Sequence, residues 1–135
     1  MLYLNKDWII WDCAYGEGLL VKTLREKGFN ATGDRDEFFN PTKQYTYDCI
    51  VTNPPFSKKD QFLAKCYEIG KPFALLLPIT ALEGTFRQSL YKKYGLQILF
   101  LKKRIDFTGK KAPWFAVAWF TYKFNLPKDL MFGEL

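Results

Sequence analysis

The sequence predicts an α/β fold in which a mostly parallel, twisted sheet carries helices on both faces. Short apolar runs alternate with segments of helical periodicity, as in βαβ units, and glycines stand where several of these segments end. No internal repeat or low-complexity linker interrupts the alternation. The length of 135 residues suits one domain, so we expect a single domain over 1–135, with a core over about 8–122 and a tail over 123–135.

The first half of the chain predicts three strands and two helices. The strands are short runs of apolar, aromatic or β-branched residues: Trp8–Trp11, Phe29–Thr32 and Tyr47–Thr52. A helix is expected over Glu17–Lys27, because apolar residues repeat there at helical spacing and Gly28 follows as a stop. Ser57, with Asp60 three residues later, resembles a capping box and predicts a second helix that ends at Gly70.

The second half predicts one more helix and three more strands. The strands are Pro72–Leu77, Gln97–Leu101 and the aromatic Trp114–Tyr122. A helix is expected over Ile79 to about Tyr94, with Gly84 as a weak point. The basic loop Lys102–Pro113 joins the last two strands as a hairpin. Alternation in the last strand favours a core role for its aromatic residues over a platform for stacking single-stranded bases.

The composition argues against some kinds of catalytic and metal site but does not identify a function. Twenty basic against fourteen acidic residues leave a net charge of +6, which favours approach to phosphates or other anions without identifying such a partner. The chain has no His, so the commonest general base is missing. The three cysteines, Cys13, Cys49 and Cys66, lie far apart, so we expect buried, reduced thiols and no metal site. Neither a signal peptide nor a membrane-spanning helix is predicted, and we expect a cytoplasmic protein that does not contact membranes.

The first candidate site is the turn between the first strand and the first helix. It holds the run Asp12-Cys13-Ala14-Tyr15-Gly16-Glu17-Gly18. Glycines let the backbone turn tightly there, and the amides that open the helix offer donors to a carboxylate or phosphate. The same turn also suits a doubly wound fold that binds nothing at this point. A P-loop is not supported, because no Gly-Lys-Ser or Gly-Lys-Thr follows, so phosphate is not the leading ligand.

The second candidate site follows the strand that ends at Thr52. It is the run Asn53-Pro54-Pro55-Phe56, in which two prolines stiffen the backbone and end the strand. The Asn53 amide oxygen and the Pro54 carbonyl are able to accept the two hydrogens of a planar amine while the Phe56 ring stacks on its face. The alternative is a plain loop with an aromatic plug.

In this order, the two motifs resemble those of the class I S-adenosylmethionine-dependent methyltransferases. The second motif is similar to the Asp/Asn-Pro-Pro-Tyr/Phe signature of the adenine-N6 group, and most similar to small phage-type adenine methylases. The resemblance runs from about Trp8 to Tyr122 and includes three later segments: Arg104–Phe107, Ala112–Phe115 and Trp119–Phe120. It implies a Rossmann-like methyltransferase fold with an antiparallel carboxyl-terminal strand, abridged between the second and third strands, in the cytoplasm of a bacterial or phage-infected host cell.

The resemblance also implies roles for individual residues, with S-adenosyl-L-methionine as cofactor. The residues that would line its methionine end are Asp12, Ala14, Tyr15, Gly16 and Gly18. Asp34 would hold the ribose hydroxyls, Asp36 the adenine, and Phe38 would lie beside the adenine ring. Asn53 would contact both cofactor and substrate. The predicted catalytic residues are Asn53, Pro54, Pro55 and Phe56.

The implied reaction is methyl transfer to N6 of adenine in DNA or RNA. It needs no strong base, which agrees with the absence of His, and in a duplex the adenine would have to flip out of the stack. Lysines and arginines near the predicted site would form a basic rim for backbone phosphates, or else are ordinary solvated side chains: Lys58-Lys59, Lys102-Lys103-Arg104 and Lys110-Lys111.

The chain departs from the family in three respects. The usual Phe-x-Gly element is missing ahead of Asp12, the two acidic motifs are compressed into Gly33–Phe39, and no target-recognition domain is present. A second copy or a partner subunit would then close the site. Two other functions stay open: a methyltransferase acting on a protein glutamine amide, whose family usually has Tyr in place of Phe56, and a cofactor-binding, cofactor-degrading or accessory protein without methylation activity.

Overall fold

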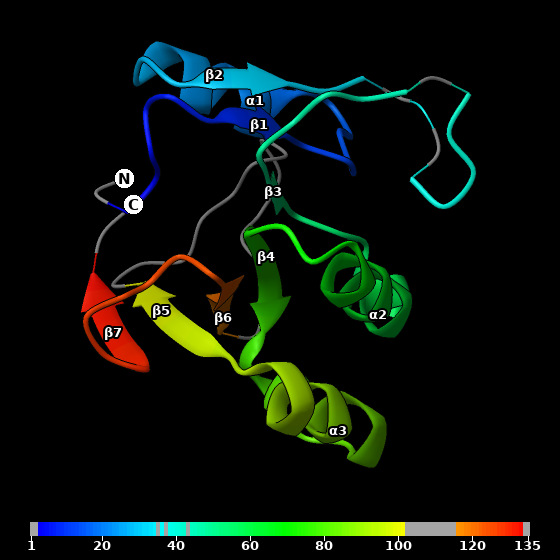
Figure 1. The fold of residues 1–135 in the computed structure, drawn as a ribbon, viewed down its shortest axis with the longest axis vertical. Helices are drawn as coiled ribbons and strands as arrows, with labels where there is room; N and C mark the ends of the chain where they lie inside the picture. The colour runs from blue at the N-terminus through cyan, green and yellow to red at the C-terminus, as the bar shows by residue number, and fades with distance from the viewer. Residues whose placement is uncertain (1–2, 35, 37, 43, 102–115, 134–135) are drawn as a thin grey trace.

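The computed structural model of the chain describes residues 3–34, 36, 38–42, 44–101 and 116–133. These residues form one sheet of seven strands with helices packed against it (Figure 1). The strands are β1 (Ile9–Trp11), β2 (Asn30–Thr32), β3 (Cys49–Thr52), β4 (Phe73–Pro78), β5 (Gln97–Leu101), β6 (Val117–Tyr122) and β7 (Leu130–Gly133). The α-helices are α1 (Leu19–Glu26), α2 (Lys59–Ile69) and α3 (Thr85–Tyr94), and two 3₁₀ turns are η1 (Phe56–Lys58) and η2 (Ile79–Leu82).

The strand order is β2-β1-β3-β4-β6-β5-β7. Strands β2, β1, β3 and β4 are parallel to one another, and β6 runs antiparallel to both of its neighbours, β4 and β5. This Rossmann-like arrangement confirms the predicted, mostly parallel sheet with an antiparallel strand near the carboxyl terminus. The chain leaves β1 toward β2 and then returns past β1 to β3, so the sheet has a switch point between β1 and β3. Ligand sites of open α/β sheets lie at such points.

Helices cover both faces of the sheet, as the sequence predicts. On one face, the apolar side of α1 packs with Val51 of β3 and with Trp119 of β6. On the other face, α2 and α3 pack with Ile50 of β3 and with Phe120 of β6. Neighbouring residues of one strand therefore enter different cores, which explains why the central strands are apolar runs rather than alternating patterns.

Two local predictions for the helices are wrong. The helix expected over Ile79 to Tyr94 is divided, because Gly84 adopts φ +104° between η2 and α3, outside helical geometry. The capping box at Ser57 and Asp60 does not form, since η1 precedes α2 and no side chain caps α2. The Asp60 carboxylate instead forms an ion pair with Arg87 of α3 at 2.8 Å, so it joins two helices.

The segment after β6 adds a strand that the sequence does not predict. β7 pairs in parallel with β5, and Leu126 is buried just before it. Leu130 and Phe132 of β7 remain exposed, although the Phe132 ring stacks on Phe100 with centroids 5.2 Å apart. The last long strand is described from residue 116 onward, and the burial of Trp119 and Phe120 confirms their predicted core role.

The connection between β2 and β3 is abridged, as expected. Its described residues contain no helix or strand, and side-chain hydrogen bonds hold them instead. Across the described parts of the chain, no helix combines the length and apolarity that a bilayer crossing requires.

Candidate functional site

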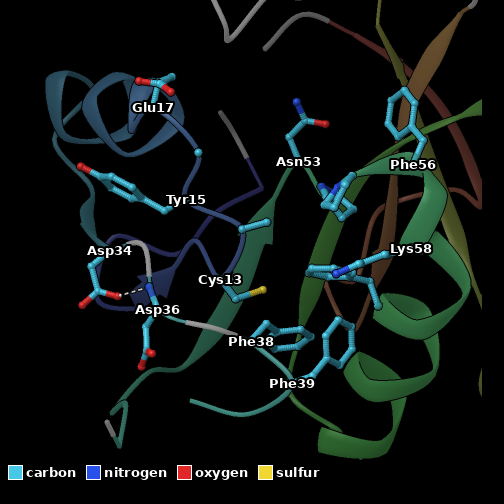
Figure 2. A pocket seen from close by; sticks show the side chains of 15 residues that line it. Cys13, Tyr15, Glu17, Asp34, Asp36, Phe38, Phe39, Asn53, Phe56 and Lys58 are labelled. Atoms are coloured by element: carbon cyan, nitrogen blue, oxygen red, sulfur yellow. Dashed lines mark hydrogen bonds between the residues drawn. The ribbon is translucent and has the colours of Figure 1, made fainter. Parts of the chain in front are cut away.

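A pocket of about 700 Å³ opens at the carboxyl ends of β1, β2 and β3, beside the switch point of the sheet (Figure 2). This volume lies within the range of about 300–1,000 Å³ typical of small-molecule sites. Three loops build its wall: the turn after β1, the segment after β2 and the corner after β3. The lining residues are Cys13, Ala14, Tyr15, Gly16, Glu17, Asp34, Asp36, Phe38, Phe39, Asn53, Pro54, Pro55, Phe56, Lys58 and Phe62.

The sequence-predicted residues divide into two groups. Ten of them line this pocket: Ala14, Tyr15, Gly16, Asp34, Asp36, Phe38, Asn53, Pro54, Pro55 and Phe56. Asp12 and Gly18 do not line it, although both support the turn that does. The fold thus brings together residues from three loops, and Ala14 and Phe56 are 42 positions apart in the sequence.

Asp12 lies behind the turn rather than in the pocket. Its side chain is buried, and its Oδ1 accepts a hydrogen bond from the Ala14 amide at 3.2 Å and another from the Thr52 hydroxyl. Burial raises the pKa of the Asp12 carboxyl to about 6, against the lowering effect of these two hydrogen bonds. In this structure Asp12 supports the turn, and its contact with a cofactor stays a prediction.

Gly18 and Gly33 lie next to the Tyr15 side chain, which occupies the space that a Cβ at either position would need. Gly18 has φ +81°, and a Cβ there would lie 2.5 Å from the Tyr15 hydroxyl oxygen. Gly33, which the sequence analysis does not single out, has no room for a Cβ either, since it would lie 2.8 Å from the Asp12 carbonyl oxygen and 2.9 Å from the Tyr15 ring. The Tyr15 side chain therefore lies between two glycines that come from different loops.

The two acidic residues after β2 share one hydrogen-bond donor. The Tyr45 hydroxyl donates to Asp34 Oδ1 at 2.8 Å and to Asp36 Oδ2 at 2.9 Å. The Asp36 amide also donates to Asp34 Oδ1 at 3.0 Å (Figure 2). Thr42 donates to Asp36 from both its amide and its hydroxyl. Burial and the two carboxylates raise the pKa of Tyr45, so its hydroxyl stays protonated and donates.

Aromatic residues form the floor of the pocket, and Phe38 is part of the core. Phe38 is 3% exposed, and its ring is stacked on Phe62 and meets Trp11 edge-on. Phe39 is 37% exposed and meets both Phe38 and Phe62 edge-on. Of this pair, Phe39 has the more accessible ring, which the sequence analysis did not single out.

The segment Asn53–Phe56, called the Asn53 corner, forms another part of the pocket wall (Figure 2). Asn53 is half-buried, and its amide makes no hydrogen bond with the part of the chain that the structure describes. β3 ends at Thr52, so the Pro54 carbonyl lies beyond the last residue paired with β4. Pro54 is buried and Pro55 is exposed, so the corner packs against the protein on one side and faces solvent on the other.

Of the basic residues predicted to form a rim around the site, Lys58 is the one that the described structure places in the pocket lining. Lys58 lines the pocket beside the Asn53 corner, whereas the Lys59 ammonium lies 3.5 Å from the Phe56 carbonyl oxygen. The basic clusters at 102–104 and 110–111 lie outside the described residues, as do the similar segments at 104–107 and 112–115.

The cysteines are unpaired and buried, as predicted. Burial raises the pKa of the Cys13 thiol well above its usual range, which favours the thiol over the nucleophilic thiolate. The described residues hold no group of three His, Cys, Asp or Glu side chains placed to bind a metal ion.

Comparisons with known proteins identify no family for the chain. No protein-family model matches it, and no curated protein does. One solved structure that aligns with it is a putative methyltransferase from Thermoplasma acidophilum, with 15% sequence identity and a TM-score of 0.37. The alignment covers 94% of this chain and 60% of the other, so the chain spans less than two thirds of that protein's length.

Proposed function

We propose that the protein transfers a methyl group from S-adenosyl-L-methionine to N6 of adenine in DNA or RNA. The observation that carries this proposal is that the glycine-containing turn and the Asn53 corner line one pocket from neighbouring parallel strands, β1 and β3. A cofactor held by the turn and an amine held by the corner would therefore lie side by side. The resemblance of both motifs to adenine-N6 methyltransferases supports the same assignment.

Several features of the pocket support S-adenosyl-L-methionine as the proposed cofactor. The pocket is large enough for a small molecule, and Gly16 of the turn lines it, so that the Gly16 backbone amide would serve as a donor for a carboxylate. Asp34 and Asp36 supply acceptors for hydroxyl and amine hydrogens at the other end, and Phe39 supplies an apolar ring surface. When bound, the cofactor supplies an electrophilic methyl group on a sulfonium.

The Asn53 corner would prepare the amine for attack. The lone pair of an exocyclic amine is delocalised into the ring, so the amine is a poor nucleophile. The Asn53 amide oxygen and the Pro54 carbonyl would accept its two hydrogens, which favours a pyramidal nitrogen with a localised lone pair. The Phe56 ring would hold the base by stacking. Rate enhancement would come from positioning and preorganised dipoles, and the chain needs no His for it.

Nucleic acid is the proposed partner. The net charge of +6 favours association with a polyanion, and Lys58 lines the pocket next to the corner. We further propose that a second copy or another subunit completes the pocket.

Labelled cofactor tests this function. The purified protein is incubated with methyl-labelled S-adenosyl-L-methionine and, separately, duplex DNA, single-stranded DNA, RNA and total protein. We expect label on adenine N6 and a loss of at least about 100-fold in rate for Asn53→Ala, the size of effect seen when a positioned polar group is removed from an active site. Asn30→Ala, an exposed substitution on β2, is the matched control and should be neutral.

Other outcomes select the other functions. Label on protein glutamine would show that the corner holds an amide of a side chain instead of a base. Cofactor binding or breakdown without transfer to any substrate would assign the chain to cofactor-binding, cofactor-degrading or accessory proteins, and Asn53→Ala would then change little.

A further inference from the structure

The hydroxyl of Thr52 lies between the two loops that form the proposed active site. Thr52 is the last residue of β3, is fully buried, and directly precedes Asn53. Its Oγ1 accepts a hydrogen bond from the Ala14 amide at 3.0 Å and donates one to Asp12 Oδ1. The Ala14 amide also lies 3.2 Å from Asp12 Oδ1, so the three groups form a closed triangle.

The backbone alone does not make this connection. The register between β1 and β3 ends with Trp11 opposite Ile50, one residue before Asp12 and two before Thr52. The Asp12 amide bonds instead to Thr32 of β2. Beyond the paired residues, the Thr52 hydroxyl is the link that the described structure places between the glycine-containing turn and β3.

A hydroxyl satisfies both of its neighbours at this position. Asp12 presents an acceptor and the Ala14 amide a donor, so the group between them must donate in one direction and accept from the other. A valine has the same shape and does neither, so the Ala14 amide and Asp12 Oδ1 would each lose one hydrogen bond and keep only the 3.2 Å hydrogen bond to each other. The burial of Thr52 keeps water from replacing it.

We propose that Thr52 is a positioning residue that couples the conformation of the cofactor-binding turn to that of the Asn53 corner. This inference rests on the proposed function. A change in the turn at Asp12 or Ala14 would move Thr52 and, through the next peptide unit, Asn53. The Thr52 side chain would thus adjust the position of the bound cofactor relative to that of the amine.

A kinetic comparison tests the proposal against a merely structural role. Thr52→Val is compared with Thr52→Ser, which keeps the hydroxyl, and with Thr121→Val. Thr121 is a buried threonine of β6 whose hydroxyl donates to the Gln97 carbonyl at 2.9 Å, away from the pocket. We expect Thr52→Val to weaken binding of S-adenosylhomocysteine and to lower kcat, each by about tenfold or more, whereas Thr52→Ser restores most of both and Thr121→Val changes neither.

A nuclear magnetic resonance experiment without cofactor separates this inference from the proposed function. The side-chain amide signals of Asn53 are recorded with and without Asp12→Asn, in the natural sequence and in the Thr52→Val background, as a double-mutant cycle. We expect Asp12→Asn to shift the Asn53 signals in the first case and to leave them in place in the second.

Equal shifts in both backgrounds would overturn the coupling even if methyl transfer were found. A protein that binds no cofactor and transfers no methyl group would overturn the proposed function, and the cycle at Asn53 would still decide the coupling.

Discussion

The ring of Tyr45 is stacked on the indole of Trp11, with centroids 4.5 Å apart and 18° between the planes. Trp11 is the last residue of β1 and is buried, so it provides a fixed surface for the Tyr45 ring. From there the Tyr45 hydroxyl reaches both Asp34 and Asp36. A stacked ring and one hydroxyl thus organise the short connection between β2 and β3 where the described residues contain no helix.

Replacing this hydroxyl should loosen both carboxylates. We expect Tyr45→Phe to weaken S-adenosylhomocysteine binding about tenfold, because hydrogen bonds to charged groups contribute about 1.5–3 kcal/mol. Isothermal titration calorimetry measures the change. Tyr47→Phe is the control, since its ring also contacts Trp11, at 4.8 Å, while its hydroxyl has no hydrogen bond with the described residues. Equal effects of the two substitutions would refute the role of the Tyr45 hydroxyl.

The neighbouring rings Phe38 and Phe39 should respond differently to removal. Phe38→Ala removes a ring that is 3% exposed and stacked on Phe62, so it should cost about 3–5 kcal/mol of unfolding free energy in urea titrations. Phe39→Ala should cost about 1 kcal/mol and weaken S-adenosylhomocysteine binding by about three- to tenfold, through loss of an accessible ring. Unchanged affinity in Phe39→Ala would remove Phe39 from the ligand site.

Gly18 and Gly70 have nearly the same backbone conformation. Comparing their alanine variants therefore separates the effect of backbone strain from that of steric crowding. Gly18 has φ +81° and Gly70 has φ +79°, so alanine at either position should cost about 1–2 kcal/mol through the left-handed conformation. Gly70 has open space around it, whereas a Cβ at Gly18 must displace Tyr15 from the pocket wall. We expect both variants to lose stability and Gly18→Ala alone to lose S-adenosylhomocysteine affinity. Normal binding by Gly18→Ala would show that the position of Tyr15 is unimportant.

The buried Asp12 should make stability depend on pH. Burial raises the pKa of its carboxyl to about 6, above its value in the unfolded chain. The folded protein therefore binds this proton more tightly than the unfolded chain does. Its contribution to stability is full below about pH 4 and is lost as the pH rises through about 6. Over this range, the natural protein should lose about 3 kcal/mol of unfolding free energy relative to Asp12→Asn.

Urea titrations at pH 4, 5, 6 and 7 measure this difference. The comparison with Asp12→Asn is necessary because other groups titrate in the same range and contribute equally to both proteins. A difference that stays constant with pH would show that Asp12 keeps an ordinary pKa in the folded state.

The elements of the fold and the position of the pocket follow from local patterns. Apolar runs mark β1, β3 and β4, because burial on both faces leaves a signature within a few residues. Crossover connections make these strands parallel, so their carboxyl ends lie at the same end of the sheet. The turn after β1 and the corner after β3 meet there for that reason, and both are visible in the sequence.

The contacts within the pocket follow from no local pattern. Phe38 and Phe39 are chemically identical neighbours, and only packing against Trp11 and Phe62 buries one and leaves the other accessible. The parallel pairing of β7 with β5 is likewise a long-range contact of a short, half-exposed strand.

The sequence by itself determined the alternation of strands and helices and the two motifs that face each other across the pocket. Only the tertiary structure decided that Asp12 lies behind the pocket, that Tyr45 holds Asp34 and Asp36, and that Thr52 joins the two loops. Strand and turn signals depend on neighbours within a few residues. A hydrogen bond between residues 40 apart depends on how the whole sheet closes, and the identity of either partner alone does not specify it.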